Sequence, residues 1–319
     1  MKVLVTGADG FVGAWLVRRL LQADHAVTGT HRLGGGPSQM LSAAERSRVA
    51  WRALELTSGD SVDGVLRSER WDAVVHLAAL SSGAEARSDP GRAWAVNAAG
   101  TARLAEALGH RGTTVSGSQP APVLLLVSTA EVYGVGSGAR RETDPPAPCS
   151  PYAASKLGAE IAALEVARRT GLRVIVARPF PHTGPGQGIR FVVPALAARI
   201  RAAQRIGAPA IKTGSLEPVR DFLDVRDVVA AYQRLLDPSI PAAVYNVASG
   251  EGYQLSDVLG RLERLVGWRV VAEYDTALAR RSDIPHLVGD AGLLRAATGW
   301  TPQIPFDQTL RDLLDAQTD

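Results

Sequence analysis

Residues 2–13 read KVLVTGADGFVG, and this stretch decides the fold. Its apolar beginning ends at a glycine, which is typical of a buried parallel strand. Gly7, Gly10 and Gly13 form the pattern G-x-x-G-x-x-G, and helical spacing continues over Phe11–Gln22. Such glycines allow a tight turn, a close approach of the backbone to a pyrophosphate, and a close contact between strand and helix. Because the helix start also offers free N–H groups to an anion, the segment predicts a dinucleotide site.

The alternation of strand and helix continues along the first half of the chain. Short apolar runs between turn residues predict further strands, and apolar residues at helical spacing predict the helices between them. This order favours an α/β fold with a doubly wound parallel sheet of the Rossmann type. The expected strands are residues 26–30, 49–54, 71–77, 123–128 and 173–178, and the expected helices lie near residues 61–68, 91–109 and 152–170.

Beyond residue 178 the composition changes, because prolines and glycines crowd residues 179–188. We expect residues 1–178 and about 224–250 to form the dinucleotide-binding Rossmann domain. Residues from about 179–223 and 251–319 would form a smaller, discontinuous substrate-binding lobe. The elements expected here are helices near residues 191–205, 224–237 and 255–267, a strand at 243–247 that rejoins the main sheet, and a tail of loop and short helices from residue 280; loops are expected at 34–38 and 113–122.

The bulk composition excludes several classes of protein. Of the 319 residues, 46% are apolar and 21% charged, which is an ordinary globular balance. The net charge is only +3 and no run of like charge occurs, so nucleic-acid binding has little support. Cys149 is the only cysteine, which excludes an internal disulfide and suits a reducing compartment. With no signal peptide and no apolar stretch of membrane-spanning length, the sequence predicts a cytoplasmic protein with neither a membrane nor a metal partner.

The end of the second expected strand bears on the choice of cofactor. An NAD-binding protein of this kind carries Asp or Glu there, to hold the ribose hydroxyls. This strand instead ends Thr30-His31-Arg32, and the Arg32 guanidinium suits a 2′-phosphate. The sequence therefore favours NADP(H) over NAD(H), and a solvated surface arginine is the alternative interpretation of Arg32.

A tyrosine and a lysine share one face of the helix expected at residues 152–170. Tyr152 and Lys156 lie four apart, and a neighbouring ammonium lowers the pKa of a phenol from its free value of about 10. Lys156 is one of three lysines in a chain that otherwise uses arginine. Ser128 and Thr129 close the fifth strand, so their hydroxyls are expected at the carboxyl edge of the sheet, where ligands bind in this fold. The alternative role of Thr129 is to cap the following turn.

Three further motifs accompany the glycine turn and Tyr152-x-x-x-Lys156: His76-Leu77-Ala78-Ala79, Asn97, and STAEVYG at residues 128–134. As a set they resemble the extended short-chain dehydrogenase/reductase family. The resemblance runs from residue 1 to about residue 310, which is nearly the whole chain. It implies an enzyme that binds a nicotinamide dinucleotide on a Rossmann domain and transfers a hydride.

The resemblance also implies roles for single residues. Thr129 would hydrogen-bond the reacting oxygen, Tyr152 would be the acid–base catalyst, and Lys156 would hold the nicotinamide ribose. Asn97 would steady the cofactor end of its helix, although a plain structural asparagine fits equally well. The other implied cofactor contacts are Gly7, Gly10, Phe11, Val12, Gly13, Leu56, Leu77, Ala78, Ala79 and Pro179.

Four later segments are more specific: RPFPHTGPGQ at residues 178–187, IKTGSLEPVRDFLDVRD at 211–227, VYNVASGEGY at 244–253 and RRSDIPHLVGD at 280–290. They resemble one branch of the family, the GDP-4-dehydro-6-deoxy-D-mannose reductases. Enzymes of that branch reduce the C4 ketone of a GDP-linked 4-keto-6-deoxy sugar with NAD(P)H. The resemblance therefore implies a nucleotide-diphosphate sugar as substrate.

Arg220 and Arg280 fall where that branch and its relatives meet the nucleotide diphosphate. Guanidinium groups suit this task because their planar fork matches phosphate oxygens. Surface salt bridges with Asp221 or Asp283 are the alternative. The same resemblance implies substrate contacts at Glu131, His182 and Val193.

Pro181 departs from the branch, which usually has asparagine at this position. Proline offers no side-chain hydrogen bond and no backbone N–H. If the asparagine normally touches the substrate, this chain has lost a contact or handles a different sugar.

Other activities share the same fold. Several 4,6-dehydratases carry an acidic pair where this chain has Ala130-Glu131, so a proton donor for loss of water is missing here, although one branch of dehydratases uses only the glutamate. A 4-epimerase needs the same threonine, tyrosine and lysine, but it keeps NAD bound, and the missing carboxylate at the end of the second strand argues against it. A non-enzymatic NADP sensor would tolerate loss of Tyr152 or Lys156, and both are present.

The helix expected at residues 152–170 carries apolar residues on more than one face. Burial against both the sheet and a second copy of the chain would use these faces, so we expect a homodimer. The residues concerned are Leu157, Ile161 and Leu164, with Ala153, Ala154 and Ala163 around them.

Overall fold

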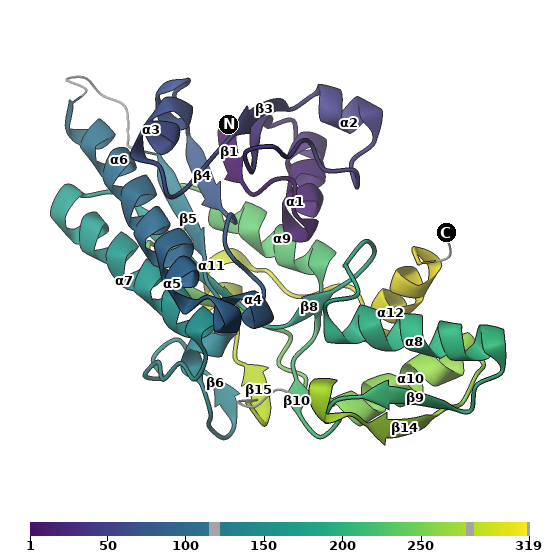
Figure 1. Cartoon of the computed structure of the whole chain (residues 1–319). Helices are drawn as coiled ribbons and strands as arrows, with labels where there is room; N and C mark the ends of the chain where they lie inside the picture. Colours follow the sequence, from purple (N-terminus) through teal and green to yellow (C-terminus); the bar gives the residue numbers. More distant parts are fainter. Residues whose placement is uncertain (115–121, 279–283, 318–319) are drawn as a thin grey trace.

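The computed structural model describes residues 1–114, 122–278 and 284–317 (Figure 1). Its central element is a seven-stranded sheet in the order β12-β7-β5-β4-β1-β2-β3. The strands are β1 (Lys2–Thr6), β2 (Ala26–His31), β3 (Ala50–Ala53), β4 (Ala73–His76), β5 (Val123–Val127), β7 (Val174–Pro179) and β12 (Val244–Val247). Every neighbouring pair is parallel, which confirms the α/β fold expected from the sequence. The helices are α1 (Phe11–Gln22), α2 (Ala43–Ser47), α3 (Gly59–Arg67), α4 (Gly83–Ser88), α5 (Pro90–Ala93), α6 (Gly100–Thr114), α7 (Pro151–Thr170), α8 (Val192–Ile206), α9 (Val225–Leu235), α10 (Leu255–Val266), α11 (Gly292–Thr298) and α12 (Phe306–Asp315).

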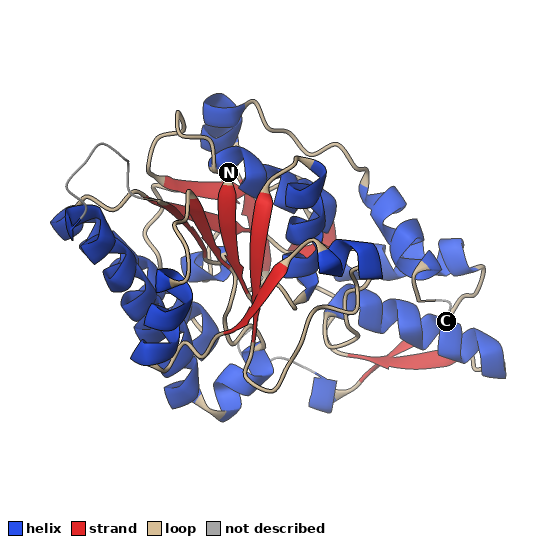
Figure 2. Ribbon diagram, turned by 90° about the horizontal axis from the view of Figure 1, so that it is seen from above, coloured by secondary structure: helices blue, strands red, loops and turns tan. Residues whose placement is uncertain are grey.

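The main sheet has a separate core on each face, because successive side chains of a strand point to opposite faces. Val3 and Val5 of β1 are buried against residues of α1 and α9. Leu4, between them, is buried against residues of α3, α6 and α7. Figure 2 shows the sheet enclosed between these two layers of helices. Strands buried on both faces are apolar throughout, which is why the sequence predicts them well.

The helix expected near residues 91–109 is interrupted in the structure. α5 passes into a π-helical turn, Trp94–Ala99, before α6 begins. A π-turn inserts an extra residue into the hydrogen-bond ladder and often occurs at functional sites. Here it carries Asn97, which is 1% exposed. Apolar spacing does not reveal such a turn, because one inserted residue barely changes the periodicity.

A second group of elements lies beside the main sheet (Figure 1). Helices α8, α10 and α12 share a core of their own. Two parallel strands accompany them, β9 (Ala210–Thr213) and β14 (Val271–Tyr274). These elements come from the stretches that the sequence assigns to the smaller lobe, and the division into domain and lobe stays a prediction.

Very short strands join the two parts of the chain. A four-stranded sheet has the order β13-β10-β15-β6, and β6 comes from the first 178 residues while the others come later. A further pair, β8 and β11, is parallel. The bounds are β6 (Ala139–Arg140), β8 (His182–Thr183), β10 (Val219–Arg220), β11 (Leu223–Asp224), β13 (Tyr253–Gln254) and β15 (His286–Gly289).

The remaining expectations concern loops and the membrane. Residues 34–38 form a loop, as expected. The other expected loop, 113–122, begins inside α6, and its residues 115–121 lie outside the described ranges. Across the described ranges, no helix combines the length and the apolar character needed to cross a membrane.

Candidate active site

The candidate site lies where the strands of the main sheet end. In a parallel sheet the carboxyl ends of all strands meet at one edge, and ligands bind there. The glycine turn follows β1, residues 77–79 follow β4, Ser128 and Thr129 follow β5, and Pro179 ends β7. Leu56, which follows β3, is buried. The strand topology therefore brings these separate motifs to the same edge.

The glycine turn between β1 and α1 has no room for side chains. Gly7 has φ +69°, and a Cβ there would lie 2.9 Å from backbone atoms of the loop after β4. A Cβ on Gly13 would lie 2.2 Å from the carbonyl oxygen of Gly7. Gly10 precedes the helix without any side-chain cap, which leaves the N–H groups of Phe11 and Val12 to an outside acceptor. This cradle fits the pyrophosphate of a dinucleotide.

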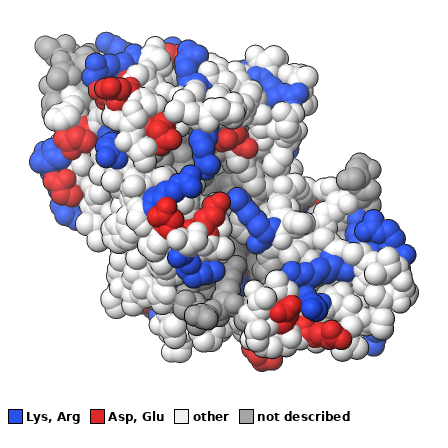
Figure 3. Space-filling model, in the orientation of Figure 1, with Lys and Arg blue, Asp and Glu red and all other residues white. Residues whose placement is uncertain are grey.

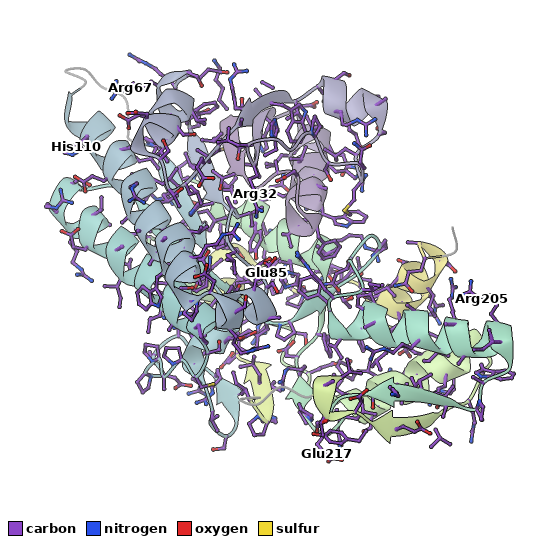
Figure 4. All side chains as sticks on the ribbon, viewed as in Figure 1. Arg32, Arg67, Glu85, His110, Arg205 and Glu217 are labelled. Atoms are coloured by element: carbon purple, nitrogen blue, oxygen red, sulfur yellow. The ribbon has the colours of Figure 1, made fainter. Side chains whose placement is uncertain are left out.

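The end of β2 presents one exposed cation. Thr30 is buried, and its Oγ1 accepts a hydrogen bond from the Gly7 N–H at 3.2 Å, so it holds the glycine turn. Arg32 is exposed (Figure 4), and its guanidinium makes no hydrogen bond or ion pair within the described residues. Its charge contributes to a lowered pKa of Glu55, after the hydrogen bonds from Thr57. The Arg32 guanidinium is thus available to a ligand at the adenosine side.

Thr129, Tyr152 and Lys156 meet beyond the end of β5. Thr129 caps a short 3₁₀ turn, because its Oγ1 accepts the Glu131 N–H at 3.2 Å. The same hydroxyl lies close enough to the Tyr152 phenol to act on its pKa, so capping and a role in the site are compatible. Lys156 is 4% exposed, and its Nζ donates to the Val127 carbonyl at 2.5 Å. The three side chains that the sequence singles out are therefore neighbours.

The pKa of Tyr152 differs from the sequence-based expectation. Lys156 was expected to lower it, but burial raises the pKa of this phenol above its ordinary value, since burial disfavours the phenolate. The Glu131 carboxylate raises it further, and the nearby Thr129 hydroxyl opposes the rise. Burial lowers the pKa of Lys156 to about 8, against the opposing effect of the Glu160 carboxylate. At neutral pH Tyr152 therefore keeps its proton and Lys156 its charge.

Asn97 ties the loop after β4 to α7. Its Oδ1 accepts the Leu80 N–H at 2.8 Å, and its Nδ2 donates to the Leu80 carbonyl at 3.1 Å and to Ser155 Oγ at 2.9 Å. Ser155 in turn donates to the carbonyl of Tyr152 at 2.8 Å. The π-turn thus places Asn97 so that it fixes the loop at residues 77–79 relative to the Tyr152 backbone.

His76, at the end of β4, is a buried neutral histidine. Its ring nitrogens hydrogen-bond Thr6 Oγ1 at 2.7 Å and Thr101 Oγ1 at 3.1 Å. Thr101 donates to the Asn97 carbonyl at 2.6 Å. Burial, and then the charge of Lys156, lower the pKa of His76 to about 3. This histidine holds strand ends together and stays uncharged at neutral pH.

The residues expected to contact substrate differ in their burial and in their distance from Tyr152. Glu131 lies close enough to Tyr152 for its charge to act on the phenol. His182 is half-buried, and its Nδ1 hydrogen-bonds the Phe180 carbonyl at 2.9 Å. Val193 is 1% exposed in the core of α8, which favours packing over ligand contact for its side chain. Pro181 accepts the Leu223 N–H at 2.9 Å through its carbonyl, so the short β8–β11 pairing begins at this proline.

Arg220 is half-buried in β10, and its Nη1 donates to the Val219 carbonyl at 2.9 Å. The neighbouring Asp221 carboxylate is 0% exposed and accepts hydrogen bonds from Ser249 and from the backbone N–H of Gly250. Asp221 therefore anchors the loop after β12. Arg280 and Asp283 lie outside the described residues.

A buried ion pair behind the site was not predicted from the sequence. Arg178 donates to both oxygens of Glu160, with its Nη2 2.7 Å from Oε2, and the two side chains are 7% and 2% exposed. Ser128 Oγ also donates to Glu160. The guanidinium stacks 4.8 Å from the ring centre of Tyr133, whose hydroxyl donates to Asn246. The available signal was a glutamate four residues after Lys156, on the helix face that meets the sheet.

The surface is hollowed where the main-sheet part meets the part that carries α8 and α10, and both basic and acidic side chains border the hollow (Figure 3). In the described part of the chain, no group of three or more His, Cys, Asp or Glu side chains could hold a metal ion. The side chains that the sequence singles out in this region carry hydroxyl, phenol, ammonium, guanidinium, carboxylate and imidazole groups.

Comparison with known proteins places the chain among nucleotide-sugar enzymes. The family model described as GDP-mannose 4,6 dehydratase matches residues 4–313. A GDP-6-deoxy-D-mannose reductase of Pseudomonas aeruginosa is 37% identical over 317 residues, which cover 98% of this chain and 96% of that protein.

Two solved structures extend the comparison. The structure of RMD from Pseudomonas aeruginosa complexed with NADPH has a TM-score of 0.82 and 34% identity, and covers 99% of this chain and 98% of that chain. The UDP-glucose 4-epimerase of Thermus thermophilus, in complex with NAD, has a TM-score of 0.85 and 28% identity, with the same coverage. The fold is shared by reductases and epimerases, so the type of reaction must be argued from the site.

Proposed function

Because the chain belongs to the GDP-mannose 4,6 dehydratase family, we propose that it reduces the C4 ketone of a nucleotide-linked 4-keto-6-deoxy sugar, GDP-linked by preference, with NADPH. The named relatives include nucleotide-sugar reductases, epimerases and dehydratases. The observation that carries the reductase is the meeting of Thr129, Tyr152 and Lys156 at the carboxyl edge of the sheet, together with the exposed Arg32, which suits the 2′-phosphate of a reducing cofactor. The 37% identity to a GDP-6-deoxy-D-mannose reductase supports the same reaction.

The catalytic roles follow from the hydrogen bonds of the site. The bound dinucleotide would supply the hydride that adds to C4. Tyr152 would donate its proton to the C4 oxygen, and Thr129, whose hydroxyl lies close to that phenol, would donate a hydrogen bond to the same oxygen. Lys156, fixed on the Val127 carbonyl, would hold the ribose beside Tyr152.

The cofactor we propose is NADP(H) rather than NAD(H). Arg32, exposed after β2, would pair with the 2′-phosphate, and the NADPH complex of RMD supports this choice. The glycine turn would hold the pyrophosphate through the first N–H groups of α1. The remaining cofactor contacts we propose are Leu56, Leu77, Ala78, Ala79, Asn97 and Pro179.

For the substrate we propose a nucleotide-diphosphate sugar. Arg220 and Arg280 would bind the diphosphate, as guanidinium groups suit bidentate phosphate contacts. His182 donates through Nδ1 to the Phe180 carbonyl in its neutral form, which leaves Nε2 as an acceptor for a sugar hydroxyl. Glu131 would face the sugar near Tyr152, and Val193 would contribute through packing beneath the substrate.

The test incubates purified protein with NADPH and candidate sugar nucleotides, and follows absorbance and product stereochemistry together. We expect stoichiometric oxidation of NADPH with a 4-keto-6-deoxy sugar nucleotide, and a higher kcat/KM for the GDP-linked sugar than for UDP-, ADP- or dTDP-linked ones. Interconversion of 4-epimers without net consumption of NADPH would overturn the reductase and favour an epimerase.

One observation favours a second candidate, a 4,6-dehydratase. The Glu131 carboxylate acts on the Tyr152 phenol, and such a base could remove a sugar proton during loss of water. Ala130 is apolar, so the neighbouring position supplies no acid. Release of a 4-keto-6-deoxy product from a GDP-hexose with NADP⁺ would identify this activity in the same assay.

A further inference from the structure

We propose that Glu160 is a positioning residue for the reaction proposed above: from α7 it holds Ser128, and through Ser128 it fixes the place of Thr129 relative to Tyr152. Neither the sequence motifs nor the named relatives assign a role to this side chain. The kinetic test of this proposal rests on the proposed reductase activity. A second measurement, the pKa of Lys156 by NMR, does not depend on turnover.

Two side chains of α7, Lys156 and Glu160, hold the end of β5, and we call this pair of contacts the clamp. Glu160 accepts a hydrogen bond from Ser128 Oγ. One helical turn earlier, Lys156 donates to the carbonyl of Val127 at 2.5 Å. Two consecutive residues at the end of β5 are thus bound by two side chains of α7, directly before Thr129. The helix that presents Tyr152 therefore also sets the position of the threonine hydroxyl that Tyr152 contacts.

Stability alone gives a poor account of a carboxylate at this place. Glu160 is 2% exposed, and burying an ion pair often contributes nothing relative to apolar side chains of the same size. The pair is well made, since Arg178 approaches Glu160 with Nη2 at 2.7 Å and Nε at 3.1 Å. Once Arg178 has satisfied the charge, the carboxylate still has a lone pair for Ser128, and an apolar residue could not provide this acceptor.

The charge of Glu160 also reaches the ammonium of Lys156. The titratable groups that interact with Lys156 are Glu160 on α7 and His76 at the end of β4. Tyr152 lies one helical turn before Lys156 on α7, and Arg178 of β7 is ion-paired with Glu160. His76 is neutral and Tyr152 protonated at neutral pH, so Glu160 is the anion that opposes the effect of burial on the pKa of Lys156. Removing this anion should lower the pKa of Lys156 below about 8.

Two variants separate positioning from folding. Glu160→Gln removes the charge, and Ser128→Ala removes the hydrogen bond while leaving the ion pair with Arg178 intact. We expect each to lower kcat by roughly tenfold or more, the worth of a buried hydrogen bond to a charged group, with KM for the sugar nucleotide changed less than kcat. The matched control is Asp63→Asn, which breaks an exposed pair with Arg67 on α3 and should leave kcat unchanged.

The pH dependence of kcat/KM distinguishes positioning from a purely structural role, because a structural role would not change it. In the wild type, kcat/KM should fall as pH rises through about 8, because Lys156 loses its proton. In Glu160→Gln this fall should move to lower pH, whereas Ser128→Ala should leave it in place. Titration of the three lysines by NMR after isotope labelling measures the same shift without turnover, with Lys2 and Lys212 as internal references.

The outcomes are distinct. If the wild type does not turn over, the proposed function fails, and the NMR titration still tests the influence of Glu160 on Lys156. If the wild type turns over and folded Ser128→Ala keeps its kcat, the clamp is wrong. If Glu160→Gln does not fold, Ser128→Ala alone decides, because the ion pair stays intact in it. A loss of kcat in Ser128→Ala with unchanged affinity for NADPH supports the clamp.

Discussion

At the scale of single residues, the site depends on a phenol that keeps its proton. Burial and the nearby Glu131 raise the pKa of Tyr152, so its phenol is protonated at neutral pH, and we propose it as the proton donor in the reductive direction. Tyr152→Phe should lower kcat by about 10²–10⁴-fold, the usual contribution of a positioned acid, and should leave NADPH affinity nearly unchanged. Lys156→Met should reduce both kcat and the affinity for NADPH, since Lys156 is expected to hold the ribose of the cofactor as well. Steady-state rates and a cofactor titration measure these effects, and near-normal turnover in Tyr152→Phe would remove this tyrosine from the mechanism.

The choice of cofactor is a second residue-scale question. Arg32 is exposed at the end of β2, and its guanidinium makes no hydrogen bond or ion pair in the described part of the chain, so a 2′-phosphate would gain a charge-assisted contact. Arg32→Ala should weaken NADPH binding by about 10- to 100-fold, equivalent to roughly 1.5–3 kcal/mol, and leave NADH binding unchanged. Titration of both cofactors against both proteins is the measurement. A wild type that binds NADH more tightly than NADPH would contradict the assignment.

Where a motif has one geometric meaning, the structure brings its residues together as the sequence predicts, and their roles in the reaction stay predictions. Thr129, Tyr152 and Lys156 are neighbours because parallel strands end at one edge and because four residues make about one helical turn. Prediction from the sequence failed for the pKa of Tyr152, since burial depends on the whole fold and outweighs the effect expected of Lys156. The buried pair of Glu160 and Arg178 was also missed, because nothing in a single sequence marks which surface a glutamate faces.

At the scale of elements, the long strands and helices were predicted and the shortest strands were not. A strand such as β5 is apolar throughout, and its pattern is visible in the sequence. Strands of two residues, such as β6 and β10, have no period to detect, and their pairing is set by tertiary contacts. Arg220 lies in β10 itself, so sequence reasoning describes the cofactor side better than the substrate side.

One loop connects those two sides. Trp15 of α1 donates to the Pro185 carbonyl at 3.1 Å, and Gly186, with φ +85°, lies against Met40. Gln187 in the same loop donates to the carbonyl of His182 at 3.0 Å. The segment after β2 and the helix of the glycine turn therefore support the loop that carries a proposed substrate contact.

A substitution in this loop tests that support. Gly186→Ala forces a side chain into the left-handed region at a cost of about 1–2 kcal/mol, and its Cβ would lie 2.5 Å from Met40 Cε. We expect a raised KM for the sugar nucleotide and a lower free energy of unfolding, with NADPH affinity nearly unchanged. The matched control is Gly188→Ala, where no atom lies within 4 Å and φ is not in the left-handed region. Equal KM values for the two variants would show that the loop does not position the substrate.

At the scale of the whole molecule, the resemblance to the extended short-chain dehydrogenase/reductase family is confirmed, and it extends through both parts of the chain. The parallel sheet alone would serve many activities. The four-stranded sheet connects the main sheet with the substrate side. In it, β6 from the first part of the chain pairs with β15, close to the proposed diphosphate site. The two parts of the chain are therefore joined through the pairing of β6 with β15.

The oligomeric state is the last prediction, and it concerns the face formed by α6, α7 and the π-turn. Trp94 is 47% exposed and Ile161 61% exposed on this face, although α7 buries its other side against the sheet. The two residues line one concave apolar surface together with Gly158 and Ala162, and a two-fold axis through it would pair α7 with α7 of a second copy.

We therefore expect a homodimer, with sedimentation equilibrium giving twice the chain mass of 33.6 kDa. Ile161→Arg should shift the protein to monomer. Each copy of the chain contributes one new charge, so the two-fold axis would bury two like charges in the same interface. Ile206→Arg is the matched control, since Ile206 is 76% exposed at the end of α8, away from this face, and should leave the dimer intact. A wild type that sediments as a monomer at micromolar concentration contradicts the dimer. An Ile161→Arg variant that remains a dimer would instead place the interface elsewhere, and the apolar face of α7 would then need another occupant.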